Sequence, residues 1–163
     1  MQAAVRGVNV IYWFAINLGP NPPGLDLDCI ANVSATLRRL TLPTTHMVTV
    51  GGWDAPHPSL YRDASVMYAE WKQWNVNVVA RPGFETGFDG VDWDLEGNDD
   101  VASEWNNMTA HTLDLVGGFS QLAKADGYLV TLVPCESYLD PTTSLFDASL
   151  LWPYPEWRKY SRE

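Results

Sequence analysis

Four short apolar segments rich in β-branched residues recur at intervals of about 40 residues along the chain. They are Val8–Phe14, His46–Val50, Gly90–Leu95 and Tyr128–Val133. Apolar residues at helical spacing lie between them, so strand-like and helix-like patterns alternate. Because a strand, a helix and a second strand form a right-handed crossover unit, this order predicts a parallel sheet in an α/β fold.

Three amphipathic helices are expected between these strands. Their predicted bounds are Asp26 or Asp28 to Pro43, Ser59 to Pro82, and Met108 to Lys124, with Gly127 as a left-handed stop. The residues expected to face inward are Leu27, Ile30, Leu37 and Leu40 in the first helix, Leu60, Met67, Trp71, Trp74 and Val78 in the second, and Leu115, Phe119 and Leu122 in the third.

The length of the chain limits the architecture. Its 163 residues favour a single domain spanning residues 1–163. A complete barrel of eight βα units takes ~250 residues, and more at the spacing found here, so we expect a sheet that does not close. The alternatives are an open sheet of four or five strands and part of a larger barrel. The aromatic and proline-rich stretch beyond Pro141 predicts a loop with no strand behind it.

Charge and cysteine content narrow the classes of partner. The chain has 20 Asp and Glu against 10 Lys and Arg, and its net charge of -10 disfavours nucleic acid and anionic membranes as partners. No apolar run is long enough to span a bilayer, and no signal peptide is expected, because Val8–Ile16 is interpreted as a strand. The two cysteines, Cys29 and Cys135, have no metal-binding spacing and are expected to be free buried thiols.

The third strand carries acidic residues on alternate positions. Its side chains should point to opposite faces, with Val91, Trp93 and Leu95 toward the helices. Asp92, Asp94 and Glu96 would then share the other face, about 7 Å apart. Mutual repulsion should raise the pKa of at least one of these carboxyl groups, which is what a general acid requires. Glu96 comes last, at the carboxyl end of the strand, where α/β barrels bind substrate.

Two other interpretations of the acidic segment remain. Asp-x-Asp-x-Glu-Gly resembles the start of a calcium-binding loop, but Ser103 occupies the twelfth position, where a bidentate acid is expected. A solvated acidic loop is the second, favoured by Asn98-Asp99-Asp100. The alternation with valine, tryptophan and leucine favours the strand over both. The three histidines show no spacing typical of a catalytic triad or a zinc site.

The spacing Asp89-x-x-Asp92-x-Asp94-x-Glu96 resembles the fourth-strand signature of glycoside hydrolase family 18, the chitinases and their relatives. Three further segments are similar to the family in the same order: Val8–Ile16 to its second strand, Val48–Trp53 to its third, and Leu132–Tyr138 to its fifth or sixth. The resemblance spans nearly the whole chain but only the middle of the family's barrel. It implies a partial (β/α)8 TIM barrel of about four βα units that is not closed.

The resemblance also implies roles for individual residues. Glu96 would protonate the glycosidic oxygen of a β-1,4-linked N-acetylglucosamine polymer, and the substrate's own acetamido group would act as nucleophile. Asp94 would orient the acetamido group, and Asp92 would share a proton with Asp94. The structural motif residues are Asp89 and Gly90, and the expected substrate-binding residues are Gly52, Trp53, Glu136 and Tyr138. No metal or cofactor is implied, and the family implies secretion.

A non-catalytic carbohydrate-binding relative, or an inactive fragment, is the alternative. In the family a tyrosine from a later strand supports the acetamido carbonyl. The candidates for this tyrosine in the present sequence are Tyr154 and Tyr160, and neither lies in a strand-like segment. The residues do not choose between chitin, bacterial wall glycan and the chitobiose core of N-glycans, nor do they indicate an oligomeric state.

Overall fold

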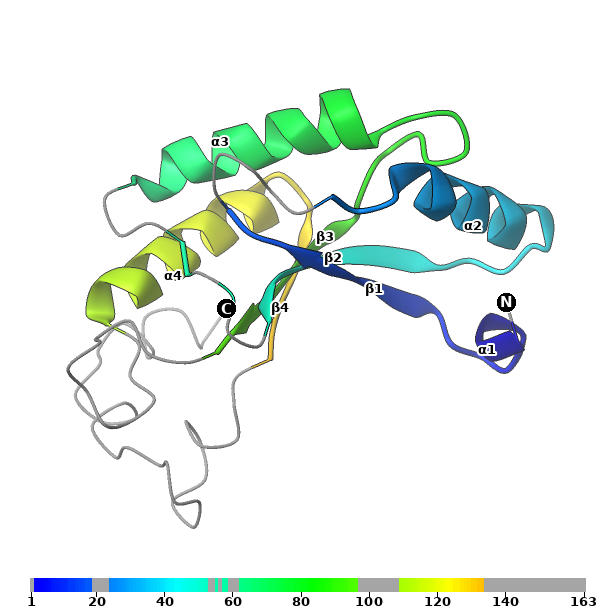
Figure 1. Cartoon of the computed structure of the whole chain (residues 1–163), viewed down its shortest axis with the longest axis horizontal. Helices are drawn as coiled ribbons and strands as arrows, with labels where there is room; N and C mark the ends of the chain where they lie inside the picture. The colour runs from blue at the N-terminus through cyan, green and yellow to red at the C-terminus, as the bar shows by residue number, and fades with distance from the viewer. Residues whose placement is uncertain are drawn as a thin grey trace, which may run out of the picture.

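The computed structural model describes residues 2–18, 24–52, 55, 57–58, 62–96 and 109–133. Four strands and four helices with one π-helical turn make up this part of the chain (Figure 1). In chain order they are α1 (Gln2–Val5), β1 (Val10–Ile16), α2 (Leu27–Arg39), β2 (Thr45–Gly52), α3 (Ala64–Trp74), η1 (Asn75–Val79), β3 (Gly90–Leu95), α4 (Ala110–Ala125) and β4 (Leu129–Leu132). All four strands lie where the sequence predicts them.

The strands form one parallel sheet in the order β1-β2-β3-β4. The helices α2, α3 and α4 pack on the same face of it, which follows when consecutive strands are joined by crossovers of one hand (Figure 1). A doubly wound fold would instead reverse its strand order and place helices on both faces. The fold is therefore α/β with an open sheet, arranged as part of a (β/α)8 barrel.

The core lies between β2, β3 and the three helices. Val91, Trp93 and Leu95 are each at most 1% exposed and point toward the helices, as predicted. The Trp93 indole meets Phe119 of α4 edge to face at 5.1 Å between ring centroids, and its Nε1 donates to Ser120 Oγ at 3.0 Å. Burial of a large aromatic with a satisfied N–H strongly stabilises a core, so this contact anchors α4 to the central strand.

A π-helical turn connects α3 to the segment that precedes β3. Asn75, the first residue of η1, is fully buried, and its side chain bonds both backbone groups of Phe88. Its Oδ1 accepts from Phe88 N at 2.8 Å, and its Nδ2 donates to Phe88 O at 3.0 Å. This pair of hydrogen bonds fixes where β3 begins relative to α3.

The predicted helices are correct in place and partly wrong in detail. The second helix begins at Ala64 with Asp63 as its cap, later than the predicted Ser59, because the Asp63 carboxylate accepts from Ser65 N at 2.7 Å. Val78 is exposed rather than inward, because the π-helical turn rotates it away from the core. Cys29 is exposed and not a buried thiol, because it lies in the first turn of α2 on the solvent side.

Two leucines predicted to face inward are also exposed. Leu40 is 49% exposed because it follows the last turn of α2, and Leu122 is 38% exposed because α4 turns it past the edge of the core. The stop at Gly127 is confirmed, since this residue has a φ of +87° directly after α4. The segments beyond Val133, including Cys135 and the expected loop beyond Pro141, lie outside the described residues.

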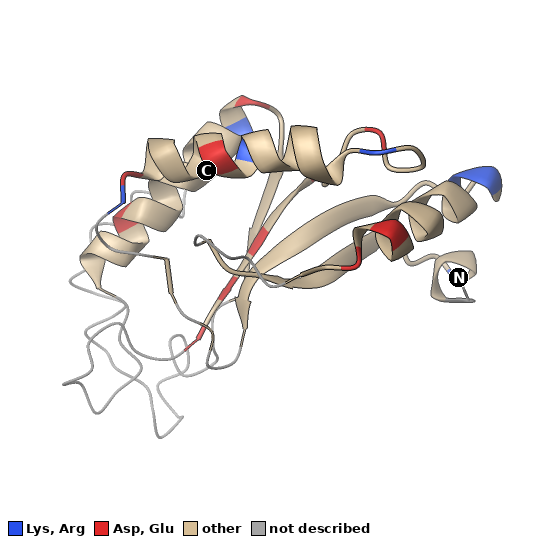
Figure 2. Ribbon diagram, turned by 45° about the horizontal axis from the view of Figure 1, so that its top comes forward, with Lys and Arg blue, Asp and Glu red and all other residues tan. Residues whose placement is uncertain are grey.

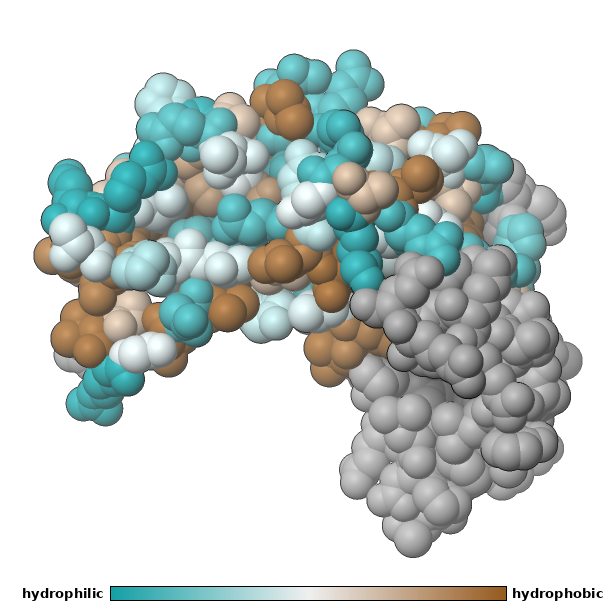
Figure 3. Space-filling view, turned by 180° about the vertical axis from the view of Figure 1, so that it is seen from behind, coloured by the Kyte–Doolittle hydropathy of each residue, from teal (hydrophilic) through white to brown (hydrophobic). Residues whose placement is uncertain are grey.

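The face of the sheet opposite the helices carries apolar side chains that reach solvent. Phe14 is 65% exposed, Leu129 51% and Val133 52%. In Figure 3 hydrophobic residues gather along the lower rim, on the side of the sheet, and hydrophilic ones cover the helices above. Within the described residues β1 and β4 each have one strand neighbour, so both edges of the sheet are open, as predicted from the length of the chain.

Two leucines of α4 test which side of this helix belongs to the core. Leu115→Ala should lower the free energy of unfolding by roughly 2–5 kcal/mol, because the side chain is 4% exposed and its removal leaves a cavity. Leu122→Ala, the same substitution on the same helix, should cost about 1 kcal/mol or less. Urea denaturation of the two variants measures both values, and equal losses would contradict the described core.

Candidate active site

The acidic row consists of Asp92, Asp94 and Glu96, which alternate with the buried residues of β3. Asp92 is 4% exposed, whereas Asp94 and Glu96 are half-buried, so the row runs from the interior toward the carboxyl end of the strand. Figure 2 shows acidic residues spaced along this strand, whereas lysine and arginine lie on helices and loops. Because Asp92 and Asp94 belong to a regular strand, the calcium-loop and solvated-loop interpretations are wrong for this segment.

Asp92 is held by one hydroxyl from each neighbouring strand. Thr131 Oγ1 of β4 donates to its Oδ1 at 2.5 Å, and Thr49 Oγ1 of β2 donates to its Oδ2 at 3.3 Å. The three residues are register partners across the sheet, so their side chains lie side by side on one face. Hydroxyl donors on both oxygens offset the cost of placing a carboxylate where water is excluded.

Asp94 has the electrostatic character expected of the row. Burial raises the pKa of its carboxyl group above the ordinary value of 3.8, and the neighbouring charges of Glu96 and Asp92 raise it further. Desolvation and like charge both favour the neutral form, which is why two or more carboxyls at one site can retain a proton. The sequence-based expectation that at least one pKa in the row is raised is confirmed for Asp94.

Glu96 follows β3 directly, at the carboxyl end of the sheet. Its backbone carbonyl accepts from Nε2 of His57 at 2.7 Å, which ties the segment after β2 to the end of β3. The position agrees with the rule that ligands of parallel α/β sheets bind at the carboxyl ends of the strands. A half-buried carboxyl group there can reach a ligand on the face of the sheet opposite the helices, here called the open face.

The glycines beside the row have packing reasons. A Cβ on Gly51, which has a φ of +107°, would lie 2.2 Å from the backbone oxygen of Asp94. A Cβ on Gly52, with a φ of +114°, would meet the Phe14 ring at 2.4 Å, and one on Gly90 would meet the backbone oxygen of Leu129 at 2.1 Å. The three glycines let neighbouring strands and Phe14 approach closely, which is a different reason from the approach of a sugar.

Asp89 lies at the amino end of β3, away from the row. Its Oδ2 accepts from the backbone N–H of His46 at 2.7 Å, and its own N–H donates to the His46 carbonyl at 2.8 Å. These bonds join the start of β3 to β2. Asp89 is thus placed to cap backbone groups, while Trp53, Glu136 and Tyr138 lie outside the described residues.

Sequence reasoning missed three residues of the open face. Thr131 contacts Asp92, and Tyr12 pairs in register with Met47 of β2, on the same face as the acids. Tyr12 is 48% exposed and Phe14 is 65% exposed, so both aromatic rings are accessible. The alternation of Val10, Tyr12 and Phe14 was the available signal, but only the strand register shows which face they share with the row.

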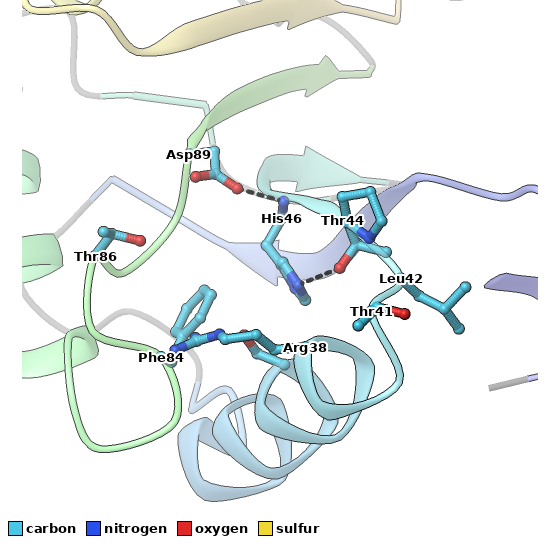
Figure 4. Close-up of a pocket in the computed structure, with 10 residues that line it drawn as sticks. Arg38, Thr41, Leu42, Thr44, His46, Phe84, Thr86 and Asp89 are labelled. Carbon is cyan, nitrogen blue, oxygen red and sulfur yellow. Dashed lines mark hydrogen bonds between the residues drawn. The ribbon is translucent and has the colours of Figure 1, made fainter.

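A cavity of about 400 Å³ lies at the opposite, amino-terminal end of the strands (Figure 4). His46 lines it and is 3% exposed, with both ring nitrogens bonded. Trp13 Nε1 donates to His46 Nδ1 at 3.0 Å, and Thr44 Oγ1 lies 3.0 Å from Nε2. Because the indole can only donate, neutral His46 carries its proton on Nε2 and donates it to Thr44. These contacts give His46 a role in holding β1 to β2.

No group of three or more His, Cys, Asp or Glu residues within the described segments is arranged to hold a metal ion. None of the helices in that part of the chain is long and apolar enough to cross a membrane.

Several solved structures are similar to this chain. The crystal structure of a Group IV chitinase from Ostrinia furnacalis matches with 17% sequence identity and a TM-score of 0.49, over 76% of this chain and 35% of the chitinase chain. The chain thus spans about one third of that protein. No protein-family model and no curated protein sequence matches it.

The lowered pKa of His46 predicts that the folded protein loses stability in acid. Burial lowers its pKa below the ordinary value of 6.5, Asp89 acts in the opposite sense, and Arg38 adds to the lowering. The folded protein therefore binds this proton less tightly than the unfolded chain, so the free energy of unfolding should fall as the pH drops below 6.5. Urea denaturation between about pH 7 and pH 5 should show a smaller fall for His46→Gln than for the unmodified protein. Parallel curves would contradict this role.

The raised pKa of Asp94 predicts the opposite dependence of stability on pH. Its pKa is raised in the folded state, so the stability it supports is present below 3.8 and is lost as the pH rises through the folded-state pKa. Asp94→Asn should therefore unfold at higher urea concentration than the unmodified protein near about pH 7. The difference should shrink as the pH falls toward the ordinary value of 3.8, because the Asp94 carboxyl group becomes protonated and loses its charge, so the acidic sample is the internal control. A constant difference across this range would show that charge is not the cause.

Proposed function

We propose that this chain is a glycosidase that cleaves β-1,4-linked N-acetylglucosamine polymers and that the acidic row is its catalytic centre. The observation that carries the proposal is the acidic row on the open face of β3, in which the exposure of the side chains increases from Asp92 to Asp94 and Glu96. Asp92 is buried and hydrogen-bonded on both oxygens, Asp94 has a raised pKa, and Glu96 stands at the carboxyl end. A row held in this way keeps a proton available beside a carboxyl that can reach a ligand.

The mechanism follows from the resemblance to glycoside hydrolase family 18. Glu96 donates a proton to the glycosidic oxygen as the bond to the anomeric carbon breaks. The acetamido oxygen of the same sugar attacks that carbon and forms a cyclic oxazolinium-type intermediate. Water then opens the intermediate, and Glu96 takes up the proton, so the configuration is retained. Asp94 orients the acetamido N–H and offsets the developing positive charge.

Substrate contacts in this proposal come from the carboxyl end of the sheet. The proposal gives Gly52, Trp53, Glu136 and Tyr138 the binding roles that the resemblance implies, and Gly52 in addition packs against the Phe14 ring. The exposed rings of Tyr12 and Phe14 add flat apolar surface on which sugar rings can stack. Secretion of the protein, which the family resemblance implies, belongs to the same proposal.

Binding without cleavage is the second candidate. Two exposed aromatic rings on β1 can hold a sugar chain without any proton transfer, so the open face could serve as a carbohydrate-binding surface alone. The two functions differ in whether the protein hydrolyses the sugar chain, and only hydrolysis depends on Glu96 as a proton donor.

Glu96→Gln tests the proposal directly. The variant keeps the shape of the side chain but cannot donate the proton, so hydrolysis of a chromogenic di-N-acetylchitobioside should fall by about 10²–10⁴-fold. Glu85→Gln is the matched control, because Glu85 is exposed and paired with Arg38 at 2.6 Å on the far end of the sheet. Its rate should equal that of the unmodified protein.

Equal background rates in all three proteins would refute the glycosidase proposal. Binding of chitooligosaccharides, followed by tryptophan fluorescence, then decides the second candidate. Saturable binding that is lost in Tyr12→Ala or Phe14→Ala would support a carbohydrate-binding protein, and absence of binding would exclude it too.

A further inference from the structure

His57 contacts the backbone of Glu96 at a point where the pairing of the strands has ended. The register of β3 with β2 ends at the pair Leu95 and Gly52, and its register with β4 ends earlier, at Trp93. In the described part of the chain Glu96 therefore belongs to no strand pair. Its carbonyl still needs a donor, because a buried carbonyl without a hydrogen bond costs free energy.

The imidazole of His57 supplies this donor. Its Nε2 lies 2.7 Å from the carbonyl oxygen of Glu96, in a half-buried contact between residues 39 apart in the sequence. A carbonyl oxygen can only accept, so Nε2 of His57 carries a proton. The side chain thus provides the kind of hydrogen bond that a neighbouring strand provides further back along β3.

The segment that carries His57 is itself restricted. Ala55 N donates to Gly52 O at 3.1 Å, which anchors Ala55 to the end of β2. Pro58 follows His57 and is buried, and a residue before proline is limited to extended conformations. An imidazole on such a segment loses less conformational freedom on binding the Glu96 carbonyl than one on a flexible chain.

We propose that His57 is a positioning residue, whose Nε2–H fixes the Glu96 backbone and so keeps the Glu96 carboxyl group on the same face as Asp94. Side chains alternate between faces only while the backbone stays extended, and Glu96 is the member of the acidic row that lies beyond the strand pairs. The inference rests on the proposed function for its effect on turnover, since Glu96 is the proton donor there. A displacement of about 1 Å at a reacting group can cost about 100-fold in rate.

The first test needs neither substrate nor a variant. A long-range ¹H–¹⁵N NMR spectrum of the full chain identifies which ring nitrogen of neutral His57 carries the proton. The expected site is Nε2. A proton on Nδ1 instead would overturn the inference, because Nε2 could then not donate to the Glu96 carbonyl.

Two amide variants form a matched pair for the second test. The side-chain nitrogen of His57→Gln reaches about as far as Nε2, whereas that of His57→Asn reaches only as far as Nδ1. The NMR order parameter of the Glu96 amide should fall from about 0.85 toward about 0.6 in His57→Asn and stay high in His57→Gln. If the chain is a glycosidase, His57→Asn should lower kcat by about 10–100-fold with little change in KM, and His57→Gln should restore most of the rate.

An equal effect of the two variants, on the order parameter or on kcat, would overturn the role of His57, because the loss would then not follow from the donor. If the unmodified protein shows no turnover, the glycosidase proposal fails. The order parameters of Glu96 then still decide whether His57 fixes this backbone, so the two proposals can fail separately.

Discussion

The central strand β3 has two faces of opposite chemistry, and the rest of the structure depends on keeping them apart. On one face Trp93 packs against Phe119 and donates to Ser120, which fixes α4 over the sheet. On the other face Asp92 and Asp94 point away from the helices. A shift of one residue in register would bury the carboxylates under α4 and expose the tryptophan, so the apolar packing also holds the acids in place.

Within the described residues, hydroxyl groups of the neighbouring strands, rather than positively charged side chains, contact the acidic face. Thr49 and Thr131 donate to Asp92 from both sides, and the glycines of β2 and β3 let the strands come close enough for these bonds. Burial raises the pKa of Asp94, and the neighbouring charges of Glu96 and Asp92 raise it further. A carboxyl group with a raised pKa lowers the stability of the folded chain once the pH rises above that pKa.

Local patterns predicted much of this arrangement. Alternation along β3 separated Val91 and Trp93 from the acids, and helical spacing placed Ile30, Leu37, Met67 and Phe119 in the core. The same spacing was wrong for Leu40, Leu122 and Val78, since a helical stripe is buried only where another element covers it. The π-helical turn that moves Val78 depends on Asn75 and Phe88, which are brought together by the fold.

The sequence by itself determined the parallel α/β order, the places of the four strands and the shared face of Asp92, Asp94 and Glu96. These follow from periods of two and 3.6 residues, which are local properties of the chain. Only the tertiary structure decided which strands flank β3 and in which register. The contacts of Thr131 with Asp92, of Trp13 with His46 and of Phe14 with Gly52 join residues far apart in sequence. Such contacts depend on how separate strands align, and no short-range pattern specifies that alignment.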